Sequence, residues 1–359
     1  MITISLCMIV RDEEPVLARC LESVRGIPDE IIIVDTGSLD RTKTAAAAYT
    51  DLVYDFPWAD DFALARNYSF SKASMDYILW LDADDVLEEP DRQAFLRLKE
   101  ELDPRTDVVM MPYHVAFNEK GEPVFSYERE RLLKREKGFR WEGAVHEAIQ
   151  PAGVILHSPI AVSHRKEQVN DPDRNLRIFE KLLASGQRLS PRHQYYYGRE
   201  LAGHGRYEEA ARVFTEFLDS GQGWEENCAG ACLSLSECLL KLGKKREALE
   251  TLARSFAYGL PRPEICCAMG NLSMEKGELS RAIYWYKAAM SCPPEEGGFC
   301  QAEYRDIIPL LQLCVCYDRM GDYKEAYACH ERCRRLRPDH PSVKFNESYF
   351  AGLREIDKI

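Results

Sequence analysis

Three carboxylates stand close together directly after an apolar run. Residues 77–81 suit a buried strand, and Asp82, Asp84 and Asp85 follow them within four positions. Two acids in an Asp-x-Asp pattern after a strand point toward the same crevice, and the hard cations Mg²⁺ and Mn²⁺ prefer carboxylate oxygens. The pattern therefore predicts a divalent metal held for a diphosphate, whose arrival relieves the repulsion between the acids.

Three other interpretations of this acidic cluster compete with the metal site. Aspartates are favoured at helix N-caps, so the cluster could simply cap the next helix, and this alternative stays open. A calcium loop is disfavoured because the EF-hand spacing, with its central glycine and closing glutamate, is absent. A glycosidase pair is disfavoured because neighbouring residues at a strand end set no defined gap across a sugar ring.

The elements that must position these acids alternate over about the first 165 residues. Short β-rich runs predict strands at 3–10, 31–35, 53–56 and 77–81, with amphipathic helices between them. Such a rhythm is typical of a parallel sheet with both faces covered, and ligands then sit beyond the carboxyl ends of the strands. Arg11, Asp35 and Asp82 are therefore predicted along one edge of a single crevice.

The first turn after a strand is acidic rather than glycine-rich. Arg11 to Pro15 contains no glycine, so the G-x-G-x-x-G cradle for a pyrophosphate is missing. A nucleotide bound here would need a metal as counter-charge. The same turn disfavours a sugar nucleotidyltransferase, which would need a glycine-rich, basic triphosphate loop.

After a charged linker the pattern becomes wholly helical and repetitive. Four units share a glycine followed five residues later by alanine, and a small residue stands seven positions before each glycine. The glycines are Gly205, Gly243, Gly277 and Gly321, and the small residues are Gly198, Ser236, Gly270 and Cys314. The pattern resembles the tetratricopeptide repeat, a helical hairpin of about 34 residues.

Composition excludes several classes of protein. The formal charge of −12 offers no basic surface for nucleic acid, and every apolar run is far shorter than the roughly 20 residues that span a bilayer. The first residues are a strand rather than a signal peptide, so we expect a cytoplasmic protein. Of the 13 cysteines, 11 lie after residue 191 without C-x-x-C spacing, which favours reduced, buried thiols over structural zinc.

Four stretches in order carry a family resemblance: SLCMIVRDEE, EIIIVDTGSLDRT, DFALARN and LDADD. Over about the first 165 residues the chain resembles a glycosyltransferase family 2 domain of the GT-A fold. The stretches MIVRDEE, DFALARN and WEGAVHE, with the trailing repeats, also resemble the bacterial branch that includes the peptide S-glycosyltransferases of glycocin biosynthesis.

The resemblance implies an inverting transfer from a nucleotide diphosphate sugar, with Mn²⁺ or Mg²⁺. It implies that Asp35 recognises the base or ribose, Arg66 the nucleotide and Asp82 the ribose, while Asp84 and His164 hold the metal. Arg11 is expected beside the donor. Each role has an alternative: Asp35 as a turn former, Arg66 in a surface ion pair, and His164 as an ordinary surface residue.

An inverting transfer needs a base for the acceptor proton. Glu147 is the first candidate, because it follows the strand-like run Gly143 to His146, and Glu142 and His146 are alternatives. A salt bridge from Glu147 to a basic neighbour is the competing role. A cysteine acceptor would need less base assistance, since a thiol is partly ionised near neutral pH.

The predicted organisation is a GT-A domain (1–165), a helical linker (166–190), an array of about four tetratricopeptide repeats (191–345) and a C-terminal tail (346–359). The leading function is transfer of a hexose or N-acetylhexosamine, with UDP as the expected nucleotide, to a peptide or protein presented by the repeats. The array could equally form a homodimer. The alternative is a non-catalytic scaffold with a degenerate nucleotide-sugar domain. The donor sugar and the acceptor atom are not legible in the sequence.

Overall fold

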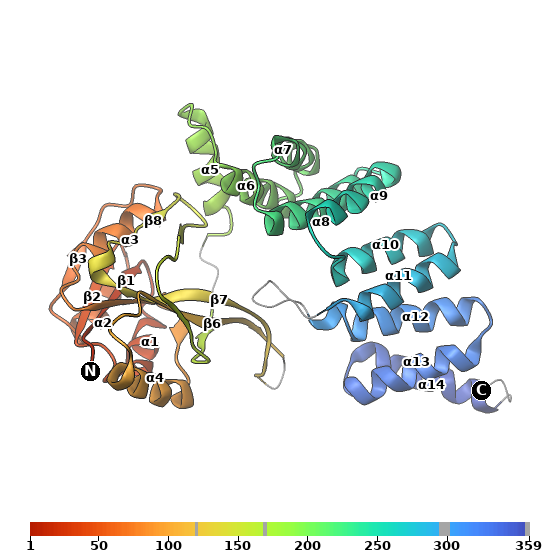
Figure 1. Ribbon diagram of the computed structural model, residues 1–359, viewed down its shortest axis with the longest axis horizontal. Helices are drawn as coiled ribbons and strands as arrows, with labels where there is room; N and C mark the ends of the chain where they lie inside the picture. The colour runs from red at the N-terminus through yellow and green to blue at the C-terminus, as the bar shows by residue number, and fades with distance from the viewer. Residues whose placement is uncertain (119–120, 168–170, 294–301, 356–359) are drawn as a thin grey trace. The chain divides into compact units, whose positions relative to one another are not determined.

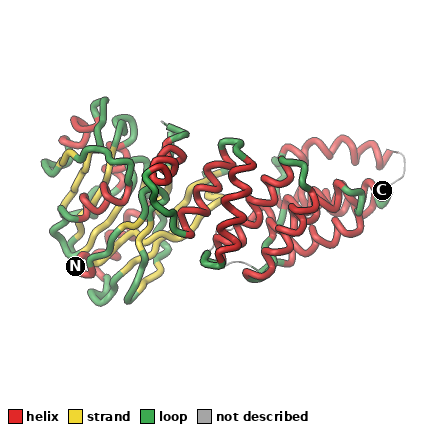
Figure 2. Tube along the Cα trace, turned by 90° about the horizontal axis from the view of Figure 1, so that it is seen from above, coloured by secondary structure: helices red, strands yellow, loops and turns green. Residues whose placement is uncertain are grey.

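The computed structural model describes residues 1–118, 121–167, 171–293 and 302–355. These residues form two compact units: unit 1 is Met1–Gln187, and unit 2 begins at Arg188. Unit 1 contains the strands and unit 2 is built of helices (Figures 1 and 2). The predicted α/β fold followed by an all-α array is therefore confirmed.

A mixed sheet forms the centre of unit 1. Among the described residues it has nine strands, eight of them in the order β3-β2-β1-β4-β7-β6-β11-β5, with β10 beside β6. The strands are β1 (Ile4–Val10), β2 (Glu30–Asp35), β3 (Val53–Asp55), β4 (Tyr77–Trp80), β5 (Asp85–Val86), β6 (Val108–Phe117), β7 (Pro123–Lys134), β10 (Ile155–His157) and β11 (Val162–His164). A separate pair joins β8 (Trp141–Glu142) to β9 (Ala148–Ile149).

Both faces of this sheet are covered by apolar packing. The helices of unit 1 are α1 (Leu17–Ser23), α2 (Thr42–Ala47), α3 (Phe62–Phe70), α4 (Glu89–Glu101) and α5 (Arg174–Ala184). Leu6 of β1 packs in one core with Leu21 of α1 and Phe95 of α4. Cys7, which points to the other face, packs in a second core with Phe70 of α3. Alternate residues of one strand thus serve two cores, as expected of a buried parallel strand.

The predicted parallel strands meet at one edge of the sheet. β1 pairs in parallel with β2 and with β4, so that Val10 lies opposite Asp35 and Cys7 opposite Trp80. The segment after β4 therefore leaves the sheet beside the ends of β1 and β2. This places Asp82 at the carboxyl edge, as predicted.

Two pairings with later strands complete this edge. The antiparallel hairpin β6–β7 joins the sheet through β7, which pairs with β4. The short strand β5 then pairs antiparallel with β11, which sets Asp85 opposite His164. Helix α4 begins at Glu89 with Glu88 at its N-cap, so the acidic cluster does not cap the next helix.

Unit 2 consists of helical hairpins that follow the predicted repeats. Its helices are α6 (Pro191–Gly203), α7 (Tyr207–Ser220), α8 (Glu225–Lys241), α9 (Lys245–Arg254), α10 (Pro263–Glu275), α11 (Leu279–Ser291), α12 (Ile307–Arg319), α13 (Tyr323–Leu336) and α14 (Pro341–Glu355). The repeated alanines are all fully buried, and they are Ala210, Ala248, Ala282 and Ala326. Helix α5 lies within the residues predicted as a linker, and α14 continues through most of those predicted as a tail.

The cysteines behave as small core residues. The twelve cysteines in the described residues are all free and buried. Burial raises the pKa of Cys314 to about 12, so this thiol stays protonated at neutral pH. Within the described ranges, no helix combines the length and apolar character needed to cross a membrane.

In two of the repeats the small residue is a glycine that makes room for an aromatic ring: Gly198 faces Phe214, and Gly270 faces Tyr286. A Cβ added to Gly270 of α10 would stand 2.6 Å from the Tyr286 ring of α11. We expect Gly270→Ala to lower the free energy of unfolding by about 1–3 kcal/mol, because the core is already filled. Gly203→Ala in α6, where the added Cβ meets nothing within 4 Å, is the control and should change stability by less than about 1 kcal/mol. Equal effects of both substitutions in urea unfolding would contradict this packing.

Candidate functional site

Asp35 ends β2 with one carboxylate oxygen fixed and the other unused. Its Oδ1 accepts hydrogen bonds from the backbone N–H groups of Gly37 at 2.9 Å and Ser38 at 3.0 Å. The side chain is buried, and Oδ2 has no hydrogen-bond partner among the described residues. The turn-forming role is therefore present, yet a buried acceptor without a partner is costly and indicates a group that a ligand would satisfy.

Arg66 joins two carboxylates from distant segments. Its Nη2 lies 2.7 Å from Oδ1 of Asp82, and its Nε lies 2.6 Å from Oε1 of Glu147. The guanidinium also lies 5.2 Å from the ring centroid of Trp80 and 4.8 Å from that of Trp141. Three of the predicted site residues thus form one cluster around a buried guanidinium rather than a surface ion pair.

The charges of two arginines keep Asp82 ionised. Burial alone would raise the pKa of Asp82, but the charges of Arg66 and Arg131 outweigh it and lower this pKa to about 2. Burial opposes the charge of Arg66 in turn, whereas Asp82 and Glu147 raise the pKa of Arg66 above its usual range. Asp82 is therefore ionised at any physiological pH.

The DFALARN helix holds the segment that carries Glu147. The Asn67 side chain donates to the carbonyl of Trp141 at 2.9 Å and accepts from its N–H at 2.9 Å. The N–H of Phe62 donates to the carbonyl of Ala144 at 2.8 Å. Helix α3 thereby holds the backbone at Trp141 and Ala144, and so fixes the position of Glu147 three residues further on.

The candidate bases differ in their surroundings. The run before Glu147 is a bend between β8 and β9 and not a strand, so that part of the prediction is wrong; His146 within it has a φ of 52°. Glu142 is exposed in β8, and the His146 ring stacks on Phe179 of α5 at 6.4 Å. Glu147, which is 11% exposed, makes the salt bridge that the sequence allowed as its competing role. Its role as base stays a prediction.

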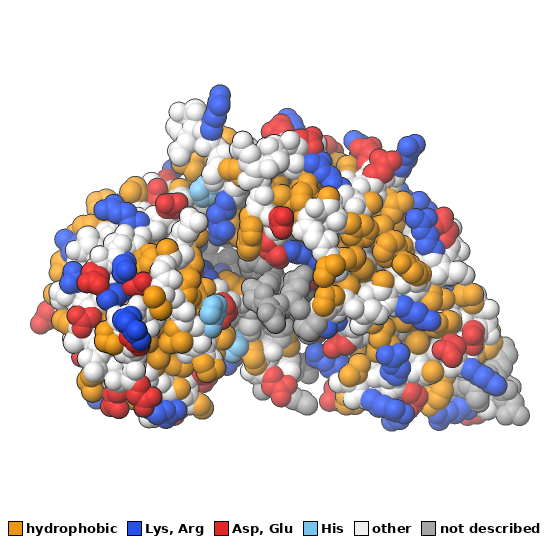
Figure 3. Space-filling view, viewed as in Figure 1, with side chains coloured by type: hydrophobic (Ala, Val, Ile, Leu, Met, Phe, Trp, Pro, Cys, Tyr) orange, Lys and Arg blue, Asp and Glu red, His pale blue; other side chains and the backbone are white. Residues whose placement is uncertain are grey.

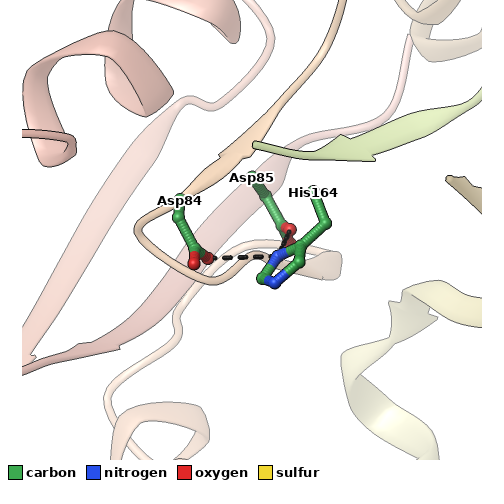
Figure 4. A group of neighbouring side chains, drawn as sticks. All are labelled: Asp84, Asp85 and His164. Atoms are coloured by element: carbon green, nitrogen blue, oxygen red, sulfur yellow. Dashed lines mark hydrogen bonds and ion pairs between the residues drawn. The ribbon is translucent and has the colours of Figure 1, made fainter. Parts of the chain in front are cut away.

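Asp84, Asp85 and His164 form the one group within the described residues whose ligand atoms could share a metal ion. One ligand atom from each lies within 4.8 Å of the others. His164 Nδ1 lies 3.3 Å from Oδ1 of Asp84 and 3.4 Å from Oδ1 of Asp85 (Figure 4). The two predicted metal ligands, Asp84 and His164, are thus brought together from positions 80 residues apart in the chain.

The acids around His164 favour its charged form. Burial alone would lower the pKa of His164, but hydrogen bonds to Asp84 and Asp85 and their negative charges raise it to about 10. Without a metal, the positively charged imidazolium of His164 therefore balances the charge of Asp84 and Asp85, as a bound cation would. A carboxylate beside an imidazole is a donor set that fits Mn²⁺, with phosphate oxygens and water as further ligands.

Several residues at this edge were not predicted as part of the site. Arg131 of β7 is fully buried and ion-paired to Asp85, and Tyr113 of β6 hydrogen-bonds to the same carboxylate. Burial and the negative charges of Asp84 and Asp82 raise the pKa of Glu13 to about 7. Residues 127–131 alternate in charge, which suits a solvated strand, so no local signal marked Arg131 as buried. Arg11, predicted beside the donor, is half exposed next to Asp12.

Comparison of the sequence with known proteins assigns the chain to a family. A TPR repeat-containing protein of Synechococcus elongatus is 30% identical over 298 residues, covering 82% of this chain and 67% of the relative. Residues 5–161 match the family model described as glycosyl transferase family 2. The chain belongs to glycosyltransferase family 2. The enzyme class and the repeat array predicted from the sequence are confirmed.

Two further relatives of this family 2 glycosyltransferase are themselves named as glycosyltransferases. The lipopolysaccharide core biosynthesis glycosyltransferase LpsC of Rhizobium meliloti is 29% identical over 161 residues, or 42% of this chain. The glycosyltransferase SunS of Bacillus subtilis is 26% identical over 219 residues, or 55% of this chain. This chain spans 58% and 49% of the lengths of these two relatives.

Proposed function

We propose that the chain transfers a hexose or N-acetylhexosamine, with inversion, from a nucleotide diphosphate sugar to a peptide or protein. The observation that carries the proposal is the Asp84–His164 pair beside the Arg66–Asp82 pair at the carboxyl edge of the sheet. The first pair suits a metal that faces a diphosphate, and the second presents fixed charges to a nucleotide. UDP is the expected nucleotide.

The donor's nucleoside would lie against Asp35 and Asp82. The unused Oδ2 of Asp35 is a buried acceptor that a base or ribose donor group would satisfy. Asp82 is one-third exposed and held by Arg66, so it offers a fixed carboxylate to ribose hydroxyls. Arg11, which is exposed at the end of β1, would balance phosphate charge.

Asp84 and His164 would hold Mn²⁺ or Mg²⁺, and a cation bound there supplies charge neutralisation to the departing diphosphate. Glu147 would accept the acceptor's proton at its free oxygen while Arg66 holds the other oxygen and fixes its direction. Trp80 and Trp141 border the Arg66 guanidinium and limit the access of water to it. The negative charge of the diphosphate would thus be balanced at the Asp84–His164 pair, and the acceptor's proton would be taken up at Glu147, beside Arg66.

Unit 2 would bind the acceptor. Helical repeats offer extended surfaces for extended peptides. Figure 3 shows apolar side chains gathered over part of unit 2. Its exposed large apolar residues are Trp224, Leu260, Tyr284, Val315, Met320, Leu336, Phe345 and Tyr349. A homodimer through these exposed apolar side chains is the alternative role of unit 2. Cytoplasm is the expected compartment, where nucleotide sugars and unmodified peptides are both at hand.

Glu147→Gln tests the assignment of the base. If Glu147 takes the acceptor's proton, kcat for an oxygen acceptor should fall about 100- to 10,000-fold while the affinity for donor stays unchanged. Glu142→Gln tests the alternative base: this exposed carboxylate, five residues away, should keep full activity if Glu147 is the base, and an equal loss would move the role to Glu142. A loss of donor affinity and stability without a specific loss in kcat would show that Glu147 serves only as the counter-ion of Arg66.

A panel of nucleotide sugars tests the function itself. The full chain is incubated with Mn²⁺ and each of UDP-glucose, UDP-N-acetylglucosamine, GDP-mannose and dTDP-glucose. We expect one donor to raise the melting temperature and to release its nucleoside diphosphate. A scaffold with a degenerate domain would release none, and that outcome would overturn the proposal. Transfer to a sugar acceptor but not to a peptide would redirect it to glycan synthesis.

A further inference from the structure

Both oxygens of the Asp85 carboxylate are already held by buried partners. Its Oδ2 forms an ion pair with Nη1 of Arg131 at 3.0 Å and accepts a hydrogen bond from the backbone N–H of Asp82 at 3.0 Å. Its Oδ1 accepts from the Tyr113 hydroxyl at 2.8 Å and faces Nδ1 of His164 at 3.4 Å. A carboxylate offers about four lone-pair positions, and three are held by partners other than His164, so Asp85 cannot turn toward a metal ion without breaking a buried contact.

Asp84 has a different environment. Its side chain is 18% exposed, whereas that of Asp85 is fully buried, and it faces Nδ1 of His164 at 3.3 Å. Asp84 can therefore turn toward a cation and a diphosphate without breaking a buried contact. Two acids adjacent in the sequence are thus unequal in their freedom to bind a metal.

Arg131 keeps Asp85 in this arrangement. The guanidinium is fully buried, and its centre lies 3.9 Å from the ring centroid of Trp80 and 4.3 Å from that of Tyr113. Its Nη1 also donates to the carbonyl of Trp80 at 3.2 Å. An arginine stays charged at any ordinary pH, so moving Asp85 onto a metal would leave a buried cation unpaired.

We infer that Asp85 is a positioning residue and not a metal ligand. Anchored by Arg131, it fixes the main chain of Asp82 through one oxygen and, through Tyr113, the ring of His164. The Tyr113 hydroxyl lies 2.9 Å from His164 Nδ1. The buried carboxylate of Asp85 thus helps to fix the positions of both Asp82 and His164. The inference rests on the proposed function, and it reduces the candidate metal ligands from three residues to two, Asp84 and His164.

Tyr113→Phe separates this role from direct ligation. Removal of the hydroxyl takes the hydrogen-bond donor away from Oδ1 of Asp85 and removes one of the partners that hold the His164 ring. If Asp85 only positions, the affinity of the full chain for Mn²⁺, measured by electron paramagnetic resonance with and without UDP, should fall about 10-fold or more. If Asp85 is a ligand, the freed oxygen should leave the affinity unchanged or raise it, and that result would overturn the inference. Tyr77→Phe, which removes a buried hydroxyl bonded to the Thr106 carbonyl, is the control and should leave Mn²⁺ affinity unchanged.

A thermal comparison gives a second readout. Asp85→Asn leaves Arg131 unpaired and should lower the melting temperature by roughly 10 °C, while Asp84→Asn should leave it nearly unchanged. Adding Arg131→Met to Asp85→Asn removes the stranded charge and should recover much of the loss. Equal melting temperatures for the two single variants would contradict the anchoring role.

The same set distinguishes the two proposals. If Asp84→Asn leaves Mn²⁺ affinity intact, the metal site of the proposed function fails. If Asp84→Asn abolishes binding but Tyr113→Phe has no effect, the metal site stands and only the positioning role of Asp85 fails.

Discussion

Replacement of Asp84 by asparagine should lower donor turnover at least about 100-fold, the usual cost of losing a charge-stabilising group. The amide keeps the size of the carboxylate but not its charge, so it binds a hard cation weakly. Because the Asp84 side chain is partly exposed and water can solvate the amide, the fold should persist. The measurement is nucleotide released per enzyme at saturating Mn²⁺, with circular dichroism as a check on folding.

His164→Ala should act in the same direction, with a loss of about 10- to 100-fold, because the imidazole supplies a second ligand without the formal charge. Asp51→Asn, which changes an exposed aspartate, serves as the control and should be silent. Unchanged turnover and an unchanged response to manganese in both site variants would remove the metal from the mechanism.

Arg66→Met should damage both stability and donor binding. It leaves Asp82 and Glu147 without the cation they share, and breaking a buried ion pair by removing one partner costs about 3–5 kcal/mol. Since Asp82 is one-third exposed, we expect the lower end of that range. Arg66→Lys should recover only part, because a point charge cannot bridge two carboxylates as the guanidinium fork does. Urea unfolding and donor affinity are the measurements.

An exposed arginine provides the control for Arg66. Arg41 pairs with Glu14, but its side chain is 82% exposed, so Arg41→Met should cost no more than about 1 kcal/mol. Comparable losses in the two variants would show that burial does not strengthen the Arg66 cluster.

The acid side of the stability curve should change as well. The pKa of Asp82 is lowered from 3.8 to about 2, so its pairing contributes stability above pH 4 and loses it as the pH falls toward 2. In Arg66→Met this dependence should shrink, because the largest of the charges that lower the pKa of Asp82 is gone and only the weaker effect of Arg131 and His164 remains.

Local sequence was enough to predict the elements that carry Asp35 and Arg66, the residues on the nucleotide side of the site. The apolar run of β1, the turn after Asp35 and the helix that presents Arg66 are each encoded by residues within a few positions of one another. Their meeting at one edge follows from parallel pairing, which is a general rule of such sheets. The roles of these residues came from the family resemblance and not from spacing.

The other half of the site depends on contacts that no local pattern reveals. Strand β5 has two residues and β11 three, too short for a periodic signal, yet their pairing sets Asp85 opposite His164. Arg131 lies in a run of alternating charges that suits a solvated strand. Only the packing of β7 beside β4 buries it against Trp80 and gives Asp85 its partner.

The antiparallel pairing of β5 with β11 has a consequence for how this enzyme is made. During synthesis the ribosome releases Asp84 about 80 residues before His164. Until then the nascent chain holds a cluster of acids that lacks its imidazole. The match to the family model also stops at residue 161. Any fragment trimmed to that boundary would keep the nucleotide-side residues and forfeit half of the cation pair.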